Sequence, residues 1–220
     1  MNVSLRTLAL ALVTSGYVEV ARAGPPVAPA TSLPASLRIR EGDLVFHRSR
    51  SAQSQAVALA TGSAYTHMGV VLVPDGRPLV LEAVQPVKLT PLPVWIARGE
   101  KGRVVVKRLR DAQRVLTPSV TQRMRRLASS WLGRPYDLQF RWDDERLYCS
   151  ELVYKLYERA AGIRIGALQK AKDLNLRNGE VQRLLARRFG GTKPPFDPEE
   201  TVISPQAMFD DPRLVTVFEN

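Results

Sequence analysis

The clearest hydrophobic pattern in the chain is a pair of apolar, valine-rich runs at 68–73 and 79–84, separated by a short segment of turn residues. Runs of this length, joined by proline, aspartate and glycine, predict two antiparallel strands in a hairpin. Two further apolar runs, at 42–46 and 103–109, predict additional buried strands, the second of them in or near the middle of the sheet. The first half of the folded chain is therefore expected to build a sheet.

The turn between the two central runs fixes which residues face each other. If the hairpin is centred between Asp75 and Gly76, His67 lies opposite Val84. Glu82 then lies diagonally beside His67 on the same face of the sheet, within reach of its imidazole. A carboxylate inside an apolar run is costly to bury alone, so Glu82 is expected to hold a partner.

Helical spacing of apolar residues predicts helices at 51–60, 117–132, 149–161 and 179–189, and a last short helix from Ser204. Thr117 has the residue type of a helix cap, and Gly133 and Gly162 are typical helix terminators. The helix at 149–161 places Cys149 at its N-terminus. The predicted strands and helices fit one domain that spans residues 37–220, without an internal repeat.

The N-terminal segment has the pattern of an export signal. A short basic start, an apolar run and Ala21-Arg22-Ala23 predict a signal peptide over residues 1–23, and a proline- and alanine-rich tether over 24–36. An uncleaved N-terminal arm is the alternative. No run approaches the roughly 20 apolar residues of a membrane-spanning helix. The expected location is thus the periplasm or another exported compartment of a bacterium.

Composition narrows the classes of partner. Lysine and arginine number 32 against 21 acidic residues, which gives a formal net charge of +11 spread along the chain. Such a surface suits anionic lipid headgroups or cell-wall polymers. Nucleic acid is not expected, because no basic block is interleaved with aromatic residues and no nucleic-acid-binding motif occurs. The single cysteine excludes an intramolecular disulfide and a multi-cysteine metal site, and no metal or other cofactor is expected.

The residue types for thiol chemistry are present. Cys149 at a helix N-terminus would lie beside the partial positive charge of unsatisfied N–H groups, which favours a thiolate. Only His47 and His67 could serve as its base, and His67 is preferred because Glu82 can orient its ring. Taken singly, however, a cysteine leading an amphipathic helix is more often an inert buried thiol, and a histidine at a strand end more often an ordinary structural residue.

Donors for a developing oxyanion are also available. The backbone N–H groups of Cys149 and Ser150 at the helix start are the first candidates. The hydroxyl groups of Tyr148 and Tyr65 are further candidates, although no spacing argument supports either of them.

At these residues the sequence resembles the YiiX/YebB-like family of permuted papain-like proteins, which is related to the NlpC and lecithin:retinol acyltransferase groups. The segments that carry the resemblance are GDLVF from Gly42, SRSAQSQAVALATGSAYTHMGVVL from Ser49, VLEAVQPVKLTPLPVWIARGEKG from Val80, LGRPYDLQFRWDDERLYCSELVYKLYE from Leu132 and ETVISPQAMFD from Glu200. They extend over nearly the whole chain after the tether. As in the permuted group, the histidine precedes the cysteine.

The resemblance implies a small α+β fold in which the nucleophile leads a helix packed on an antiparallel sheet. By motif, THMG assigns His67, LEAV assigns Glu82 and YCSE assigns Cys149. Glu151 departs from the glycine that NlpC enzymes tend to have after Cys-Ser, which puts the shape of the substrate groove in question.

Three functions follow as hypotheses. The first is an exported thiol hydrolase that cleaves an amide bond, as in cell-wall-type peptides, through an acyl-enzyme on Cys149. The second is a lipid acyl hydrolase or acyltransferase with the same three residues, whose basic surface meets anionic headgroups. The third is a periplasmic binding module that keeps the fold and performs no chemistry.

Overall fold

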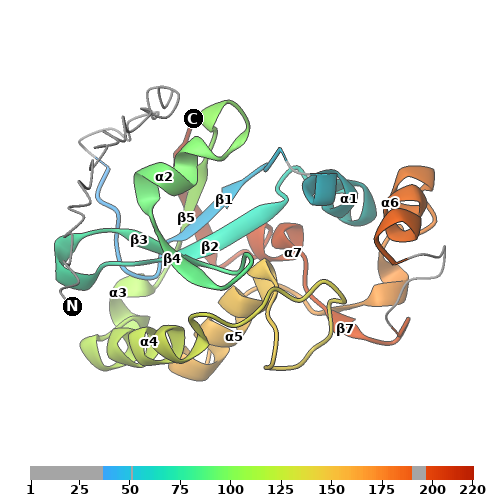
Figure 1. Ribbon diagram of the computed structural model, residues 1–220. Helices are drawn as coiled ribbons and strands as arrows, with labels where there is room; N and C mark the ends of the chain where they lie inside the picture. The colour runs from blue at the N-terminus through green and yellow to red at the C-terminus, as the bar shows by residue number, and fades with distance from the viewer. Residues whose placement is uncertain (1–36, 51, 190–196) are drawn as a thin grey trace, which may run out of the picture.

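The computed structural model describes residues 37–50, 52–189 and 197–220. The expected signal peptide and the tether lie outside these residues. The described chain forms one central sheet with helices on both faces (Figure 1). No helix within the described ranges combines the length and the apolarity needed to cross a membrane.

The sheet has six strands in the order β4-β3-β2-β1-β5-β8, and every neighbouring pair is antiparallel. Its strands are β1 (Leu44–His47), β2 (His67–Leu72), β3 (Leu79–Glu82), β4 (Lys88–Pro91), β5 (Val105–Leu109) and β8 (Leu214–Glu219). A separate two-stranded sheet pairs β6 (Gln169–Lys170) with β7 (Thr201–Val202). The α+β expectation is confirmed.

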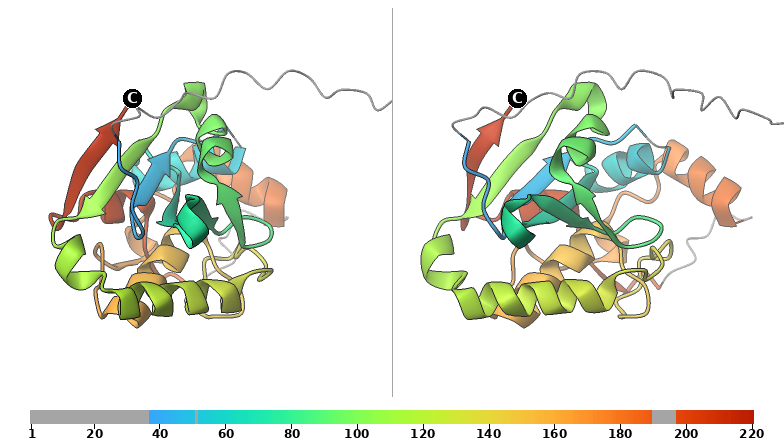
Figure 2. Two further views of the ribbon diagram at one scale, coloured as in Figure 1. Left: turned by 90° about the vertical axis from the view of Figure 1, so that its left-hand side faces the viewer. Right: turned by 60° about the vertical axis from the view of Figure 1, so that its left-hand side comes forward.

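Helices flank the sheet and extend beyond one end of it (Figures 1 and 2). They are α1 (Ala52–Thr61), α2 (Leu92–Ala97), α3 (Ala112–Val115), α4 (Pro118–Trp131), α5 (Cys149–Ala161), α6 (Gly179–Phe189) and α7 (Pro205–Phe209), with 3-10 turns η1 (Pro74–Gly76), η2 (Glu100–Gly102) and η3 (Ala171–Asp173). Helix α5 packs directly on β2 and β3, and α4 packs on α5. Helices α1 and α6 contact each other beyond the end of the sheet.

Two hydrophobic clusters cover the two faces of the sheet because side chains alternate along each strand. On β1, Leu44 and Phe46 face the large cluster that includes α4 and α5. Val45 faces the smaller cluster, which α2 closes with Trp95 and Ile96. Residues of β1, β2 and β3 belong to both clusters, so these three strands are covered on both faces.

The register expected for the central hairpin is confirmed. Val70 pairs with Leu81 and Val71 pairs with Val80, which is the alignment expected from a turn centred between Asp75 and Gly76. Helix α5 has the expected bounds and ends at Gly162, whose φ of 71° is the left-handed conformation that glycine adopts without strain.

The caps of two further helices are formed by the residues whose type predicts a cap. Thr117 accepts a hydrogen bond from the backbone of Val120 at the start of α4. Ser204 accepts one from Ala207 at the start of α7. Strands β4 and β8 and helix α2 were not predicted, because each is short or only partly apolar. Two of these elements turn out to contribute to the site described below.

Packing between α5 and the sheet gives a stability prediction. Leu152 is completely buried in the large cluster, so Leu152→Ala is expected to lower the free energy of unfolding by about 2–5 kcal/mol. The same truncation at Leu168, whose side chain is exposed, should cost less than about 0.5 kcal/mol. Denaturant unfolding of both variants measures the difference, and equal losses would contradict the packing described here.

Candidate active site

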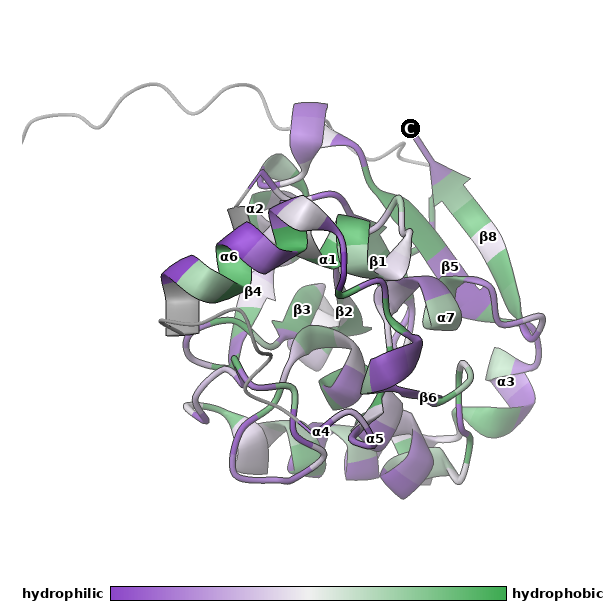
Figure 3. Cartoon of the chain, turned by 90° about the vertical axis from the view of Figure 1, so that its right-hand side faces the viewer, coloured by the Kyte–Doolittle hydropathy of each residue, from purple (hydrophilic) through white to green (hydrophobic). Residues whose placement is uncertain are grey.

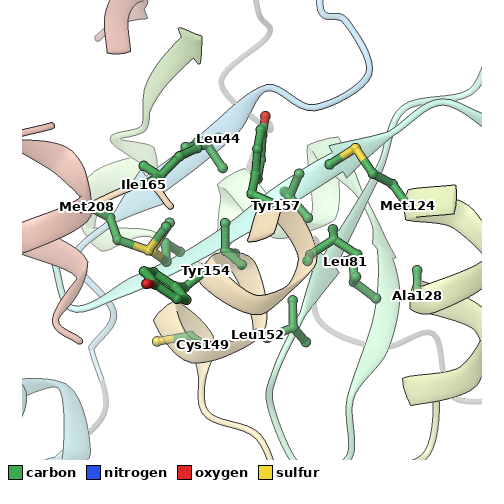
Figure 4. Packing of buried hydrophobic residues seen from close by; sticks show 14 of the residues in the cluster. Leu44, Leu81, Met124, Ala128, Cys149, Leu152, Tyr154, Tyr157, Ile165 and Met208 are labelled. Carbon is green, nitrogen blue, oxygen red and sulfur yellow. The ribbon is translucent and has the colours of Figure 1, made fainter. Parts of the chain in front are cut away.

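The start of helix α5 positions the single cysteine of the chain. Cys149 is the first helical residue, and Tyr148 before it has an extended backbone. Figure 4 shows its side chain at the first turn of the helix, at the edge of the packed residues around Leu152 and Tyr154. Only 5% of Cys149 is exposed. The thiol therefore lies near the unpaired N–H groups of a thirteen-residue helix, in surroundings from which water is largely excluded.

The imidazole of His67 contacts this thiol. His67 is the first residue of β2, the strand on which α5 packs, and Cys149 lies close enough to raise the pKa of its imidazole. The Nε2 atom of the ring lies 2.7 Å from Oε2 of Glu82, which leaves Nδ1 for the sulfur. The structure thus brings together the cysteine, the histidine and the carboxylate selected from the sequence.

Glu82 is clamped by three donors. Its side chain is completely buried on β3. Besides the bond to His67, its Oε1 accepts hydrogen bonds from the hydroxyl of Thr90 at 2.6 Å and from the guanidinium of Arg98 at 2.5 Å. Thr90 belongs to β4 and Arg98 follows α2, two elements that the sequence did not predict. With both oxygens occupied, the carboxylate has a fixed orientation toward the ring.

These contacts shift both titrating groups toward their charged forms. Burial lowers the pKa of His67, but hydrogen bonds and charge from Cys149 and Glu82 outweigh it and raise the pKa to about 9. Burial raises the pKa of Glu82, but the bonds to His67 and Thr90 and the charge of Arg98 bring it down to about 2. An imidazolium and a carboxylate near neutral pH are the result.

The second histidine is unsuited to act as the base. His47 pairs with His67 across β1 and β2, and its ring stacks on Trp95 at a centroid distance of 4.0 Å. Burial, together with the nearby positive charges of His67 and Arg98, lowers the pKa of His47 to about 2. Because the ring of His47 is neutral, it does not repel the imidazolium of His67. His47 is therefore compatible with a charged His67 but does not take up the proton itself.

Glu151 points away from the site. Its carboxylate is fully buried, accepts a hydrogen bond from the backbone of Tyr148 at 3.2 Å, and pairs with Lys155 one turn along α5 at 2.7 Å. Lys155 also bonds Asp144 in the preceding loop. Burial is the main reason that the pKa of Glu151 rises to about 8. The departure from glycine at this position therefore supports the loop that leads into α5 and does not fill the substrate groove.

The tyrosine hydroxyls considered for an oxyanion site, and the hydroxyl of Ser150, have other surroundings or partners. The hydroxyl of Tyr148 accepts a hydrogen bond from the backbone of Ile203 at 3.0 Å, and Ser150 donates to the carbonyl of Ile203 at 2.7 Å. Tyr65 stacks on Phe209 at 4.3 Å, away from the pocket that Cys149 lines. The backbone N–H groups at the start of α5 remain as candidate donors.

An apolar pocket opens at Cys149. Helix α1, helix α6, the 136–140 loop and the segment around β7 enclose it, and nearly all of its surface is carbon. Its wall includes Val57 and Ala60 of α1, Val181 and Leu185 of α6, and Ile203. Figure 3 shows α6 in front of α1 on this side of the molecule, with polar and apolar residues on the same helix. The pocket can hold an apolar group of a molecule that becomes bonded to the sulfur of Cys149.

Comparisons with known proteins identify the family of this chain. The model of the permuted papain-like amidase family, YaeF/YiiX (C92), matches residues 38–218. The chain belongs to this family. It is 47% identical over 176 residues to the uncharacterized protein YiiX of Escherichia coli strain K12, a match that covers 80% of this chain and 84% of that protein. Within this permuted papain-like amidase family, the chain is a YiiX-like member and a cysteine hydrolase by kind.

A solved structure is similar over the same region. The crystal structure of the metalloprotein yiiX from Escherichia coli O157:H7 superposes with a TM-score of 0.75 at 47% identity, over 82% of this chain and 97% of that one. In the described part of the present chain, no three His, Cys, Asp or Glu side chains are grouped to hold a metal ion.

The buried carboxylate generates a prediction about the thiol. In Glu82→Gln the imidazolium loses its counter-charge, so less of the thiolate–imidazolium pair exists at pH 6. The rate of Cys149 alkylation by iodoacetamide at that pH should fall at least about tenfold, the factor that one pKa unit represents. Glu100→Gln, at an exposed glutamate that pairs with Arg48, is the matched control and should leave the rate unchanged. Equal rates in all three proteins would contradict the role given to Glu82.

Proposed function

We propose that this chain is an exported thiol amidase that forms an acyl-enzyme on Cys149. The observation that carries the proposal is an imidazole held 2.7 Å from a buried carboxylate and close enough to Cys149 for the two side chains to interact. This arrangement favours sulfur as the anion and the ring as the proton donor. Export rests on the N-terminal sequence pattern alone.

Acylation uses the two charged partners together. The sulfur of Cys149 attacks the carbonyl carbon of the amide, and the C–S bond forms as the carbonyl oxygen becomes an oxyanion. Backbone N–H groups of Cys149 and Ser150 at the start of α5 support that oxyanion, a contribution of about 3 kcal/mol for each donor. His67 gives its Nδ1 proton to the nitrogen, the C–N bond breaks, and the amine leaves.

Deacylation returns the site to its starting state. His67, now neutral, takes a proton from water, and the resulting hydroxide adds to the thioester carbon. The C–S bond breaks, the carboxylic acid leaves, and Cys149 recovers its negative charge beside the imidazolium. Glu82 keeps the ring in one orientation through both halves and does not exchange protons, since its pKa of about 2 keeps it ionised.

The apolar pocket favours an apolar acyl group. Because the acyl carbon is bonded to the sulfur, the rest of the acyl group must extend into the space that Cys149 lines, and that space is walled by carbon. This supports the lipid-type substrate of the second hypothesis, cleaved at an amide or at an ester. A cell-wall-type peptide is the alternative, and the charge of +11 suits an anionic surface in either case.

Removing the nucleophile tests the proposal directly. Cys149→Ala and Cys149→Ser are expected to lose at least a thousandfold in turnover while their thermal unfolding stays within about 2 °C of the wild type. The measurement is mass spectrometry of N-acyl amides, phospholipid vesicles and purified muropeptides after incubation with each protein. Residual turnover within tenfold of wild type would remove Cys149 from the mechanism.

The same experiment addresses the binding-module hypothesis. A module without chemistry would leave all three substrate classes intact, and its thiol would react with iodoacetamide at pH 6 no faster than free cysteine. Faster alkylation together with Cys149-dependent loss of one substrate class supports the enzyme.

Filling the apolar pocket should change substrate choice. Ala60 lies on α1 and lines the pocket, so Ala60→Phe shortens the space available to an acyl chain. The preferred chain of a linear N-acyl amide series should become shorter by about two to four carbons, with little change for the shortest members. Kinetic assays of kcat/KM against chain length measure this, and an unchanged optimum would contradict the assignment of the pocket.

A further inference from the structure

A second cavity adjoins the apolar pocket and is bordered by His67. Cys149 does not border it, whereas the apolar pocket is bordered by Cys149 but not by His67. Val57, Tyr136 and Leu138 line both cavities and mark where they meet. A substrate that reaches both Cys149 and His67 therefore places one half in each cavity.

The two cavities differ in chemistry. The second one is bordered by polar groups from several elements: the His47 ring, the hydroxyls of Thr66 and two serines, the Gln85 amide and the Arg98 guanidinium. No aspartate or glutamate is among the described residues that line it. A polar cavity with a cation and without a lining anion favours a negatively charged ligand.

Most N–H groups of the Arg98 guanidinium are not used in the bond to Glu82. One of its terminal nitrogens bonds Oε1 of Glu82 at 2.5 Å. Within the described ranges no other acceptor is bonded to its guanidinium, which carries five N–H groups, and 37% of the side chain is exposed. Glu82 uses its other oxygen for His67, so it neutralises Arg98 only in part. The free edge of the guanidinium can form a paired contact with a carboxylate or a phosphate.

His47 supplies a second, independent observation. It is 2% exposed and borders this cavity, and its Nδ1 has no hydrogen-bond partner among the residues that the structure describes. An unpartnered polar atom at this depth costs free energy unless a ligand or water pairs with it. A neutral imidazole carries one N–H group, and in the tautomer protonated at Nδ1 it can donate a hydrogen bond to a bound anion.

We propose that this cavity binds an anionic group on the amine half of the substrate, with Arg98 as its main contact. The inference rests on the proposed function, which determines how the substrate is oriented across the two cavities. The carbonyl carbon must meet sulfur and the departing nitrogen must meet His67, so the amine half lies on the His67 side. The substrate class is then an apolar acyl group joined through an amide to an amine that carries a carboxylate or a phosphate, as in an N-acyl amino acid.

Three amides with one acyl chain test this. N-dodecanoylglycine carries a carboxylate, N-dodecanoylphosphoethanolamine carries a phosphate, and N-dodecanoylglycinamide is the neutral match of the first. The wild type is expected to favour at least one anionic amide over the neutral one by about tenfold or more in kcat/KM. The better of the two anionic substrates identifies the group. A preference for the neutral amide would overturn the proposal.

Variants separate binding of the anion from support of Glu82. Arg98→Gln should reduce the anionic-to-neutral ratio at least fivefold, and Arg98→Lys, which keeps the charge, should retain part of it. Arg48→Gln, at an exposed arginine outside the cavity, is the control and should leave the ratio unchanged. If Arg98→Gln lowers turnover of all three amides equally, Arg98 only holds Glu82 and the proposal is wrong.

Binding to the Cys149→Ala protein distinguishes this proposal from the amidase itself. Calorimetry with the glycine and glycinamide derivatives requires no turnover. A tighter Kd for the anionic compound, lost in Cys149→Ala/Arg98→Gln, supports the anion site even if the wild type hydrolyses neither. Equal Kd values would overturn the anion site and leave the amidase standing.

Discussion

The hydrogen bond between His67 and a fully buried Glu82 is the interaction on which the rest of the site depends. A lone carboxylate at this depth would be strongly destabilising, and three donors from β2, β4 and the end of α2 offset that cost. The sheet edge and α2 thereby fix the ring, and packing of α5 on β2 brings Cys149 to its free nitrogen. This one carboxylate thus joins separate elements of the fold and orients the imidazole of the site.

Periodicity and turn chemistry were sufficient to predict the central elements. The apolar runs on both sides of Asp75 and Gly76 determine the hairpin register, and therefore the approach of Glu82 to His67. The helix that Cys149 leads was recognisable from its spacing and its terminal glycine. Local patterns succeed here because each of these contacts lies within one hairpin or one helix.

The remaining parts of the site required the tertiary structure. Arg98 and Thr90 come from elements too short and too mixed in composition to be recognised, and their contacts with Glu82 join separate elements. The stacking of His47 on Trp95 likewise depends on how α2 closes over the sheet. No spacing rule indicates that α1 and α6, far apart in the sequence, enclose a pocket at Cys149. The signal peptide and the exported location stay predictions.

The charge state of His67 tests the central claim most directly. A titration of its ring nitrogens by 15N NMR from pH 5 to pH 10 should show an imidazolium at neutral pH that loses its proton near pH 9, whereas His47 stays neutral throughout. A His67 ring that is already neutral at pH 7 would contradict the account, because the pair with Cys149 would then lack its cation.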